Sequence, residues 1–269
     1  MIGKLEAIAK KIRIETLKSL TAAKSGHTGG SLGLADVFTV LYFHQMRHNP
    51  SMPDWENRDR LILSIGHVAP VLYSSLALSG YFPIDELQSL RKLNSRLQGH
   101  PGRNHGLPGL ELSAGSLGQG LSVAVGMALA AKHKNQQHNI YCITGDGELQ
   151  EGSIWEAAMS AGHFHLDNLI TLIDRNGVQI DGSTEDVMAL EPLDKKWEAF
   201  GWDVFHCDGN NIADLIKTYN KAIKKKGKPK VIIAKTIMGK GVSEIEGNYK
   251  WHGKAPNKKE LEVFLKYLS

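Results

Sequence analysis

Hydrophobic and polar positions along the chain follow two alternating periods. Short apolar runs of strand type are separated by longer stretches in which apolar residues recur at helical spacing. The expected strands cover residues 60–64, 139–144, 169–173, 202–206 and 230–234. The expected helices cover residues 5–23, 34–44, 69–78, 83–90, 114–132, 149–163, 194–200, 212–224 and 258–268. Strands that alternate with helices predict an α/β fold, in which a doubly wound, mostly parallel sheet is flanked by helices in one domain, residues 1–269.

Glycine-rich segments interrupt this pattern. Residues 25–31 are expected to form a loop between two helices, where the backbone can approach a ligand. Residues 94–113 are expected to form a long loop rich in glycine and histidine, and such loops inside a compact domain are usually functional or mobile. The three glycines within residues 114–120 predict a tight backbone contact, either with a ligand or through close packing of the helix on the sheet.

Composition and charge narrow the class of protein. The apolar fraction of 42% and the charged fraction of 22% are typical of a soluble globular protein. The formal net charge of +4 suits anionic metabolites, and no basic stripe interleaved with aromatic residues indicates a nucleic-acid partner. The two cysteines, Cys142 and Cys207, make no disulfide framework, which favours a reducing, cytoplasmic setting. The first helix lacks the apolar core of a signal peptide, and the most apolar helix, residues 121–131, is too short to span a membrane.

The segment from Gly145 to Asn176 carries the strongest candidate chemistry. It is expected to form an acidic turn after a strand, then a helix, a second strand and a polar turn. In a parallel sheet this places Asp146 and Asn176, about thirty residues apart, at the carboxyl ends of neighbouring strands, where ligands of open α/β sheets bind. A carboxylate and an amide oxygen are hard ligands that suit Mg²⁺ or Ca²⁺. Gly147 would let the backbone approach a bound phosphate, and the start of the helix favours an anion.

Together with the motifs around it, this segment resembles the transketolase family. The spacing between Gly145-Asp146-Gly147 and Asn176 is typical of thiamine-diphosphate enzymes. The other matching motifs are Ser25-Gly26-His27, Arg58-Asp59-Arg60, Leu63-Ser64-Ile65-Gly66-His67, Gln98-Gly99-His100-Pro101, Gly115-Ser116-Leu117-Gly118-Gln119-Gly120 and Trp251-His252-Gly253. Each motif is short, but in this order they are specific and cover nearly the whole chain. They are most similar to the diphosphate-binding domain of the family, and especially to the amino-terminal subunit of split transketolases.

The resemblance implies a set of site residues. The side chains of Asp146 and Asn176 and the backbone carbonyl of Val178 would bind the metal, together with diphosphate oxygens and water. The residues expected to contact thiamine diphosphate are His67, Gly115, Ser116, Leu117, Gly147, Ile180 and His252. The residues expected to hold the substrate or move protons near its reacting carbon are His27, His100 and His252. Glu151 and Glu156 match glutamates of the family that link the paired active sites.

The implied reaction is the transfer of a two-carbon ketol unit from a ketose phosphate to an aldose phosphate, as in the pentose phosphate pathway. It would use thiamine diphosphate and a divalent metal, Mg²⁺ or Ca²⁺. In this family a glutamate from a pyrimidine-binding domain also contacts the cofactor, and residues 1–269 are not expected to contain that domain. The chain is therefore expected to need a carboxy-terminal transketolase subunit for its partner, to assemble with it in a heterotetramer of two plus two, and to be inactive alone.

Three other interpretations remain open. The first is another thiamine-diphosphate enzyme, such as deoxyxylulose-phosphate synthase or a 2-oxoacid dehydrogenase subunit, although the motifs at residues 98–101 and 251–253 favour transketolase. The second is a non-catalytic, thiamine-diphosphate-binding subunit, against which the set of histidines argues. The third is a nucleotide-binding domain of Rossmann type. Such a domain would need a third glycine after Gly118-Gln119-Gly120 and a strand directly before this motif, and the sequence has neither.

Overall fold

The computed structural model describes residues 1–269, and its centre is a five-stranded sheet. The strands are β1 (Arg60–Leu63), β2 (Ile140–Gly145), β3 (Leu169–Arg175), β6 (Asp203–Asp208) and β7 (Lys230–Lys235). They lie in the order β1-β2-β3-β7-β6, and every neighbouring pair is parallel. The five predicted strands and the parallel sheet are confirmed, with strand ends that differ from the prediction by at most two residues.

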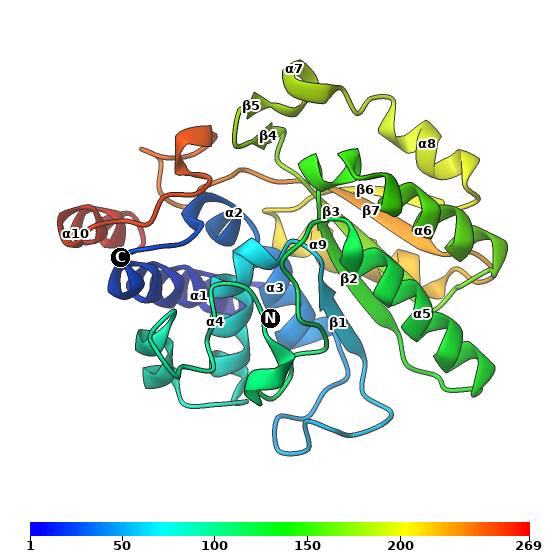
Figure 1. The fold of residues 1–269 in the computed structure, drawn as a ribbon, viewed down its shortest axis with the longest axis horizontal. Coiled ribbons are helices and arrows are strands. Elements are labelled where there is room, and N and C mark those ends of the chain that lie inside the picture. The colour runs from blue at the N-terminus through cyan, green and yellow to red at the C-terminus, as the bar shows by residue number, and fades with distance from the viewer.

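Helices cover both faces of the sheet. They are α1 (Ile2–Ala23), α2 (Thr28–Gly33), α3 (Ala35–Val40), α4 (Ala69–Ser79), α5 (Gln119–His133), α6 (Gly152–His163), α7 (Thr184–Met188), α8 (Leu193–Ala199), α9 (Ile212–Lys224) and α10 (Lys258–Tyr267). Helices α5, α6 and α8 pack on one face, and α1, α3, α4 and α9 pack on the other (Figure 1). None of these helices combines the length and the apolar character needed to cross a bilayer.

The strands supply side chains to two separate cores. On β2, Tyr141 and Ile143 join the core beneath α1, α3, α4 and α9, whereas Ile140 and Cys142 join the core beneath α5, α6 and α8. Both faces of the sheet are therefore buried, and this explains why the strand segments are continuously apolar rather than alternating. A third, smaller core packs α10 and the loop before it against α1 and α2.

The sheet topology brings several loops to one edge. Parallel strands end at the same edge, so the segments that follow β1, β2 and β3 meet there. Residue Gly145 on β2 is paired with Asp174 on β3, which places Asp146 and Asn176 just beyond neighbouring strand ends, as predicted. The chain then crosses to β6 at the far edge and returns through α9 to β7, which lies between β3 and β6.

The prediction of a loop at residues 25–31 was wrong from Thr28 onward, because these residues begin helix α2. Glycine is a poor helix former in isolation, but tertiary packing overrides that preference here. A Cβ atom on Gly29 would lie 2.5 Å from Cγ of Met238, and one on Gly30 would lie 2.9 Å from Cγ1 of Val68. The glycines therefore let a short, fully buried helix pack closely against its neighbours.

The glycines that precede α5 serve two purposes. A Cβ atom on Gly120 would lie 2.5 Å from Cβ of Ser64, at the end of β1, so this glycine permits close packing of helix on sheet. Gly118 has a φ of 82°, which favours glycine, and a Cβ atom there would meet Glu151 at 2.8 Å. Gly115 has no neighbour within 4 Å of that position. Packing rather than a ligand thus accounts for two of the three glycines.

The segment after β3 contains structure that the sequence did not indicate. Strands β4 (Val178–Gln179) and β5 (Gly182–Ser183) form a short antiparallel hairpin, and α7 follows directly. Two-residue strands are too short to show a period in the sequence, so this region was expected to be only a polar turn. The hairpin and α7 extend beyond the carboxyl edge of the sheet (Figure 1).

Candidate active site

A cavity of about 440 Å³ opens at the carboxyl edge of the sheet. The predicted site residues that line it are His27, His67, His100, Leu117, Asp146, Gly147, Glu151, Asn176, Val178, Ile180 and His252. Gly115, Ser116 and Glu156 are exposed and do not line it. Glu156 lies five positions after Glu151, which rotates it about 140° around the axis of α6 to an outward face. Its predicted role, like that of Glu151, involves a second active site and stays a prediction.

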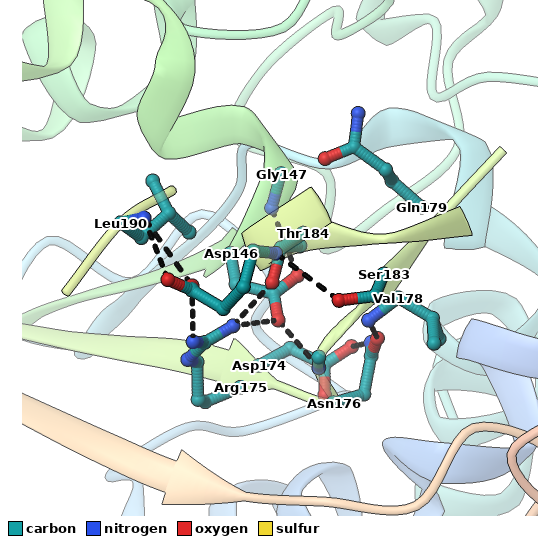
Figure 2. Close-up of polar contacts among 12 residues, drawn as sticks. Asp146, Gly147, Asp174, Arg175, Asn176, Val178, Gln179, Ser183, Thr184 and Leu190 are labelled. Carbon is teal, nitrogen blue, oxygen red and sulfur yellow. Dashed lines mark hydrogen bonds and ion pairs between the residues drawn. The ribbon is translucent and has the colours of Figure 1, made fainter. Parts of the chain in front are cut away.

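Asp146 forms the acidic side of the cavity. It follows β2 directly, and its side chain is 3% exposed. Its Oδ1 atom accepts a hydrogen bond from the backbone N–H of Gly147 (2.8 Å). Its Oδ2 atom accepts from the N–H of Gly177 (2.7 Å) and from Nη1 of Arg175 (3.1 Å) (Figure 2). Burial raises the pKa of Asp146, and these donors oppose the rise by stabilising the carboxylate.

Asn176 is oriented by a buried carboxylate. Its Nδ2 atom donates to Oδ2 of Asp174 (3.0 Å), and the hydroxyl of Thr236 donates to the other oxygen of Asp174. Because the amide nitrogen is engaged in this way, the amide oxygen points away from Asp174, where it accepts the N–H of Val178 (3.0 Å). Burial raises the pKa of Asp174 to about 7. Asp174 was missed by the sequence analysis, although it lies in the same motif as Asn176.

The oxygen atoms on this side of the cavity fit a hard divalent cation. Oδ1 of Asp146 and Oδ1 of Asn176 each accept one hydrogen bond, and such oxygens have two lone pairs. Both atoms therefore keep an acceptor site for Mg²⁺ or Ca²⁺, which prefer oxygen ligands. The backbone of Val178 lines the cavity beside them. No group of three histidine, cysteine, aspartate or glutamate side chains is arranged to bind a metal, so the structure contains no candidate for a transition-metal centre of that kind.

A second buried carboxylate, Glu148, joins the loops around the cavity. It accepts hydrogen bonds from the hydroxyl of Ser64 and from the backbone N–H groups of Gly118 (2.8 Å) and Gly145 (3.1 Å). These three partners come from the segments after β1, before α5 and at the end of β2. Glu148 was also missed, because an acidic residue after a Gly-Asp-Gly turn reads equally well as a solvent-exposed side chain.

Four histidines from distant parts of the sequence meet on the other side of the cavity. His27 precedes α2, His67 follows β1, and His252 follows the turn Tyr249–Trp251. The ring centroids of His27 and His67 are 4.9 Å apart, and those of His67 and His252 are 5.2 Å apart. His100, from the long loop that was predicted to be functional, lies 6.4 Å from His27 between ring centroids.

The environment keeps these histidines neutral. Burial lowers the pKa of His27 to about 4 and that of His67 to about 3, and the neighbouring histidines lower both pKa values further. Burial also lowers the pKa values of His100 and His252. The buried Nδ1 atom of His27 has no hydrogen-bond partner in the chain. A neutral imidazole with a free nitrogen can bind a hydroxyl group or exchange a proton with it.

Comparisons with known proteins match the whole of this architecture. Residues 5–268 match the family model described as the thiamine diphosphate binding domain of transketolase. One of the two subunits of an apulose-4-phosphate transketolase from Actinobacillus succinogenes is 45% identical over 265 residues, which cover 98% of this chain and 94% of the relative. A 6-deoxy-6-sulfo-D-fructose transketolase subunit, SqwG, from a Clostridium species is 46% identical over 92% of this chain and 90% of the relative.

Solved structures give the same result at the level of the fold. A transketolase from Campylobacter jejuni superimposes with a TM-score of 0.94 at 37% identity, over 100% of this chain. A transketolase from Leishmania mexicana superimposes with a TM-score of 0.93 at 35% identity. The chain spans 43% and 41% of the lengths of these two proteins, whereas it spans nearly all of the two subunits above.

Proposed function

The chain belongs to the transketolase family as its thiamine-diphosphate-binding subunit, and we propose that it transfers a two-carbon ketol unit between sugars together with a second subunit. The observation that carries this proposal is the single cavity in which oxygen donors for a cation face a cluster of neutral histidines. We further propose that residues 1–269 form one diphosphate-binding domain.

The acidic side of the cavity would hold the metal and the diphosphate. Asp146, Asn176 and the carbonyl of Val178 would bind Mg²⁺ or Ca²⁺, because two of these groups keep free acceptor capacity. Gly147, His67 and His252 would contact the diphosphate, and all three line the cavity. When bound, thiamine diphosphate supplies the electron sink that allows a carbon–carbon bond of the sugar to break and form.

The histidines would bind the sugar and move its protons. His27, His100 and His252 would act on hydroxyl groups near the reacting carbon, and each is neutral at pH 7 because its pKa is lowered by burial. A neutral imidazole accepts a proton from a hydroxyl group at one step and returns it at the next, which both halves of a ketol transfer require. The leucine and isoleucine that line the cavity, Leu117 and Ile180, would pack against the rings of the cofactor.

The partner would be a carboxy-terminal subunit with the pyrimidine-binding domain, in a complex of two plus two. Two lines of support are the relatives named as subunits, which have nearly the same length, and the solved transketolases, which are more than twice as long. The two buried, unpaired cysteines support a reducing, cytoplasmic setting. The relatives are named for different sugars, so the donor is proposed only as a ketose, phosphorylated or carrying another anionic group.

The test is a transfer assay with thiamine diphosphate and Mg²⁺, run on the chain alone and with a candidate pyrimidine-domain subunit. The donors would be xylulose 5-phosphate, apulose 4-phosphate and 6-deoxy-6-sulfofructose, with an aldose phosphate as acceptor. We expect transfer only in the mixture. Transfer by the chain alone would contradict the two-subunit proposal. Cofactor binding without transfer from any donor would indicate a non-catalytic subunit, and turnover of pyruvate would indicate a different thiamine-diphosphate enzyme.

A further inference from the structure

The segment Val178–Ala189 forms one wall of the cavity but contributes nothing to the apolar cores. Gln179, Ile180 and Asp181 line the cavity from this segment. Of its twelve side chains only that of Thr184 is buried, and its larger apolar residues are exposed, Ile180 by 63% and Met188 by 60%. Hydrophobic packing therefore does not hold the segment in place, so polar contacts must do so.

Arg175, the last residue of β3, supplies most of those contacts. Its Nη1 atom donates to the hydroxyl of Thr184 (2.7 Å), and its Nη2 atom donates to Glu185 (2.8 Å) and to Glu191 (3.1 Å). Glu185 in turn accepts the backbone N–H of Leu190 (3.2 Å), so the turn after α7 is drawn into the same network. A second fastening runs from Gln150 to the carbonyl of Met188 (3.0 Å) and to Gln179 (2.9 Å).

The same guanidinium also contacts Asp146. Nη1 of Arg175 donates to Oδ2 of Asp146, the oxygen that also accepts the N–H of Gly177. Figure 2 shows the guanidinium between the Asp146 carboxylate on one side and Thr184 on the other. Oδ1 of Asp146 is left with one hydrogen bond, from Gly147. The arginine side chain is 15% exposed, so water competes only partly for these bonds.

We infer that Arg175 is a positioning residue that couples the order of the segment Val178–Ala189 to the orientation of Asp146. The inference rests on the proposed function, because Asp146 matters as a metal ligand only if the cavity holds the metal and diphosphate. An ordered segment holds Arg175, which turns Oδ2 of Asp146 away from the cation site and leaves Oδ1 for the metal. Conversely, a metal on Oδ1 fixes the carboxylate, and Arg175 then holds the wall of the cavity closed.

The test uses hydrogen exchange of the backbone amides of residues 178–189, measured on the chain alone and with saturating thiamine diphosphate and Mg²⁺. In Arg175→Met we expect these amides to exchange about tenfold faster without ligand, because three side-chain hydrogen bonds to the segment are lost. With cofactor and Mg²⁺, the wild-type segment should become protected and the variant segment should not. The Mg²⁺ concentration for half-maximal cofactor binding should rise in the variant.

Two further variants separate positioning from a general structural role. Arg175→Lys keeps the charge but has a single donor group, so it should restore the contact with Asp146 in part and leave the segment loose. Arg47→Met removes an arginine that bonds Asp59 and the carbonyl of Gln137, away from the cavity, and should change neither measurement.

Each outcome decides between the two proposals. Exchange in Arg175→Met equal to that of the wild type would overturn the inference. Faster exchange with undiminished protection by cofactor and Mg²⁺ would leave Arg175 as an anchor without coupling, and so would also overturn it. Absence of protection in the wild type itself would instead count against the proposed cofactor site, whereas the comparison without ligand would still test the anchor.

Discussion

The neutral histidine cluster makes the folded chain sensitive to acid. Burial, and then the neighbouring rings of His27, His252 and His100, lower the pKa of His67 from 6.5 to about 3. The unfolded chain takes up the proton near pH 6.5, whereas the folded chain resists it. The stabilisation is therefore complete above pH 6.5 and is lost as the pH falls toward 3.

The size of the effect follows from the shift. At pH 5 an unfolded histidine is almost fully protonated, while a group with a pKa of about 3 is almost fully neutral. At 1.36 kcal/mol for each pKa unit, the difference costs the folded state about 2 kcal/mol at pH 5 relative to neutral pH. His27, whose pKa is lowered to about 4, acts in the same direction.

The assay is urea unfolding of the chain without cofactor, followed by tryptophan fluorescence at about pH 7.5 and about pH 5. Replacing His67 with Asn removes the titrating group, so the variant should lose about 2 kcal/mol less than the wild type between the two conditions. A matched control is His105→Asn, because His105 is exposed and outside the cavity. Equal losses in the wild type and the His67 variant would refute the reasoning, as would an equally large change in the control.

Three further predictions follow from packing and charge. Replacing Asp146 with Asn should abolish Mg²⁺-dependent cofactor binding in calorimetry, because the only carboxylate of the proposed metal set is lost. Replacing Gly162 with Ala should destabilise the chain by about 3 kcal/mol in urea unfolding, since its Cβ would lie 2.0 Å from a backbone oxygen, whereas the same change at exposed Gly126, which has no neighbour within 4 Å, should not destabilise it. Replacing Glu111 with Gln should cost about 3 kcal/mol, because Arg58, bonded at 2.7 Å and 11% exposed, loses its counter-charge, and a cost under about 0.5 kcal/mol would contradict this.

The sheet was predictable because its physics is local. Each strand is buried on both faces and therefore appears as a continuous apolar run, and the helices between the runs show the helical period. The proximity of Asp146 and Asn176 also followed from the sequence, because the carboxyl ends of adjacent parallel strands must meet. Residues grouped by the sheet edge were thus accessible without a structure.

What could not be predicted depends on contacts between distant segments. Helix α2 forms despite its glycines because Met238 and Val68 lie where side chains would otherwise be. Glu148 gave no signal because its partners are bound through a hydroxyl group and two backbone N–H groups. Arg175 looked like any charged residue at a strand end, and only the positions of its partners reveal its connections.

The two sides of the cavity are built on different principles, and this difference bears on the chemistry. The acidic side is cross-linked by hydrogen bonds: each oxygen of Asp146 is held by a backbone N–H, and Asn176 is held by Asp174. On the histidine side the rings lie 4.9 Å to 6.4 Å apart between centroids, and the buried Nδ1 of His27 is unpaired. A metal and a diphosphate always present the same atoms and are served best by fixed ligands. Sugars present hydroxyl groups in varied positions, and their binding is served by nitrogens whose hydrogen bonds are not already made within the protein.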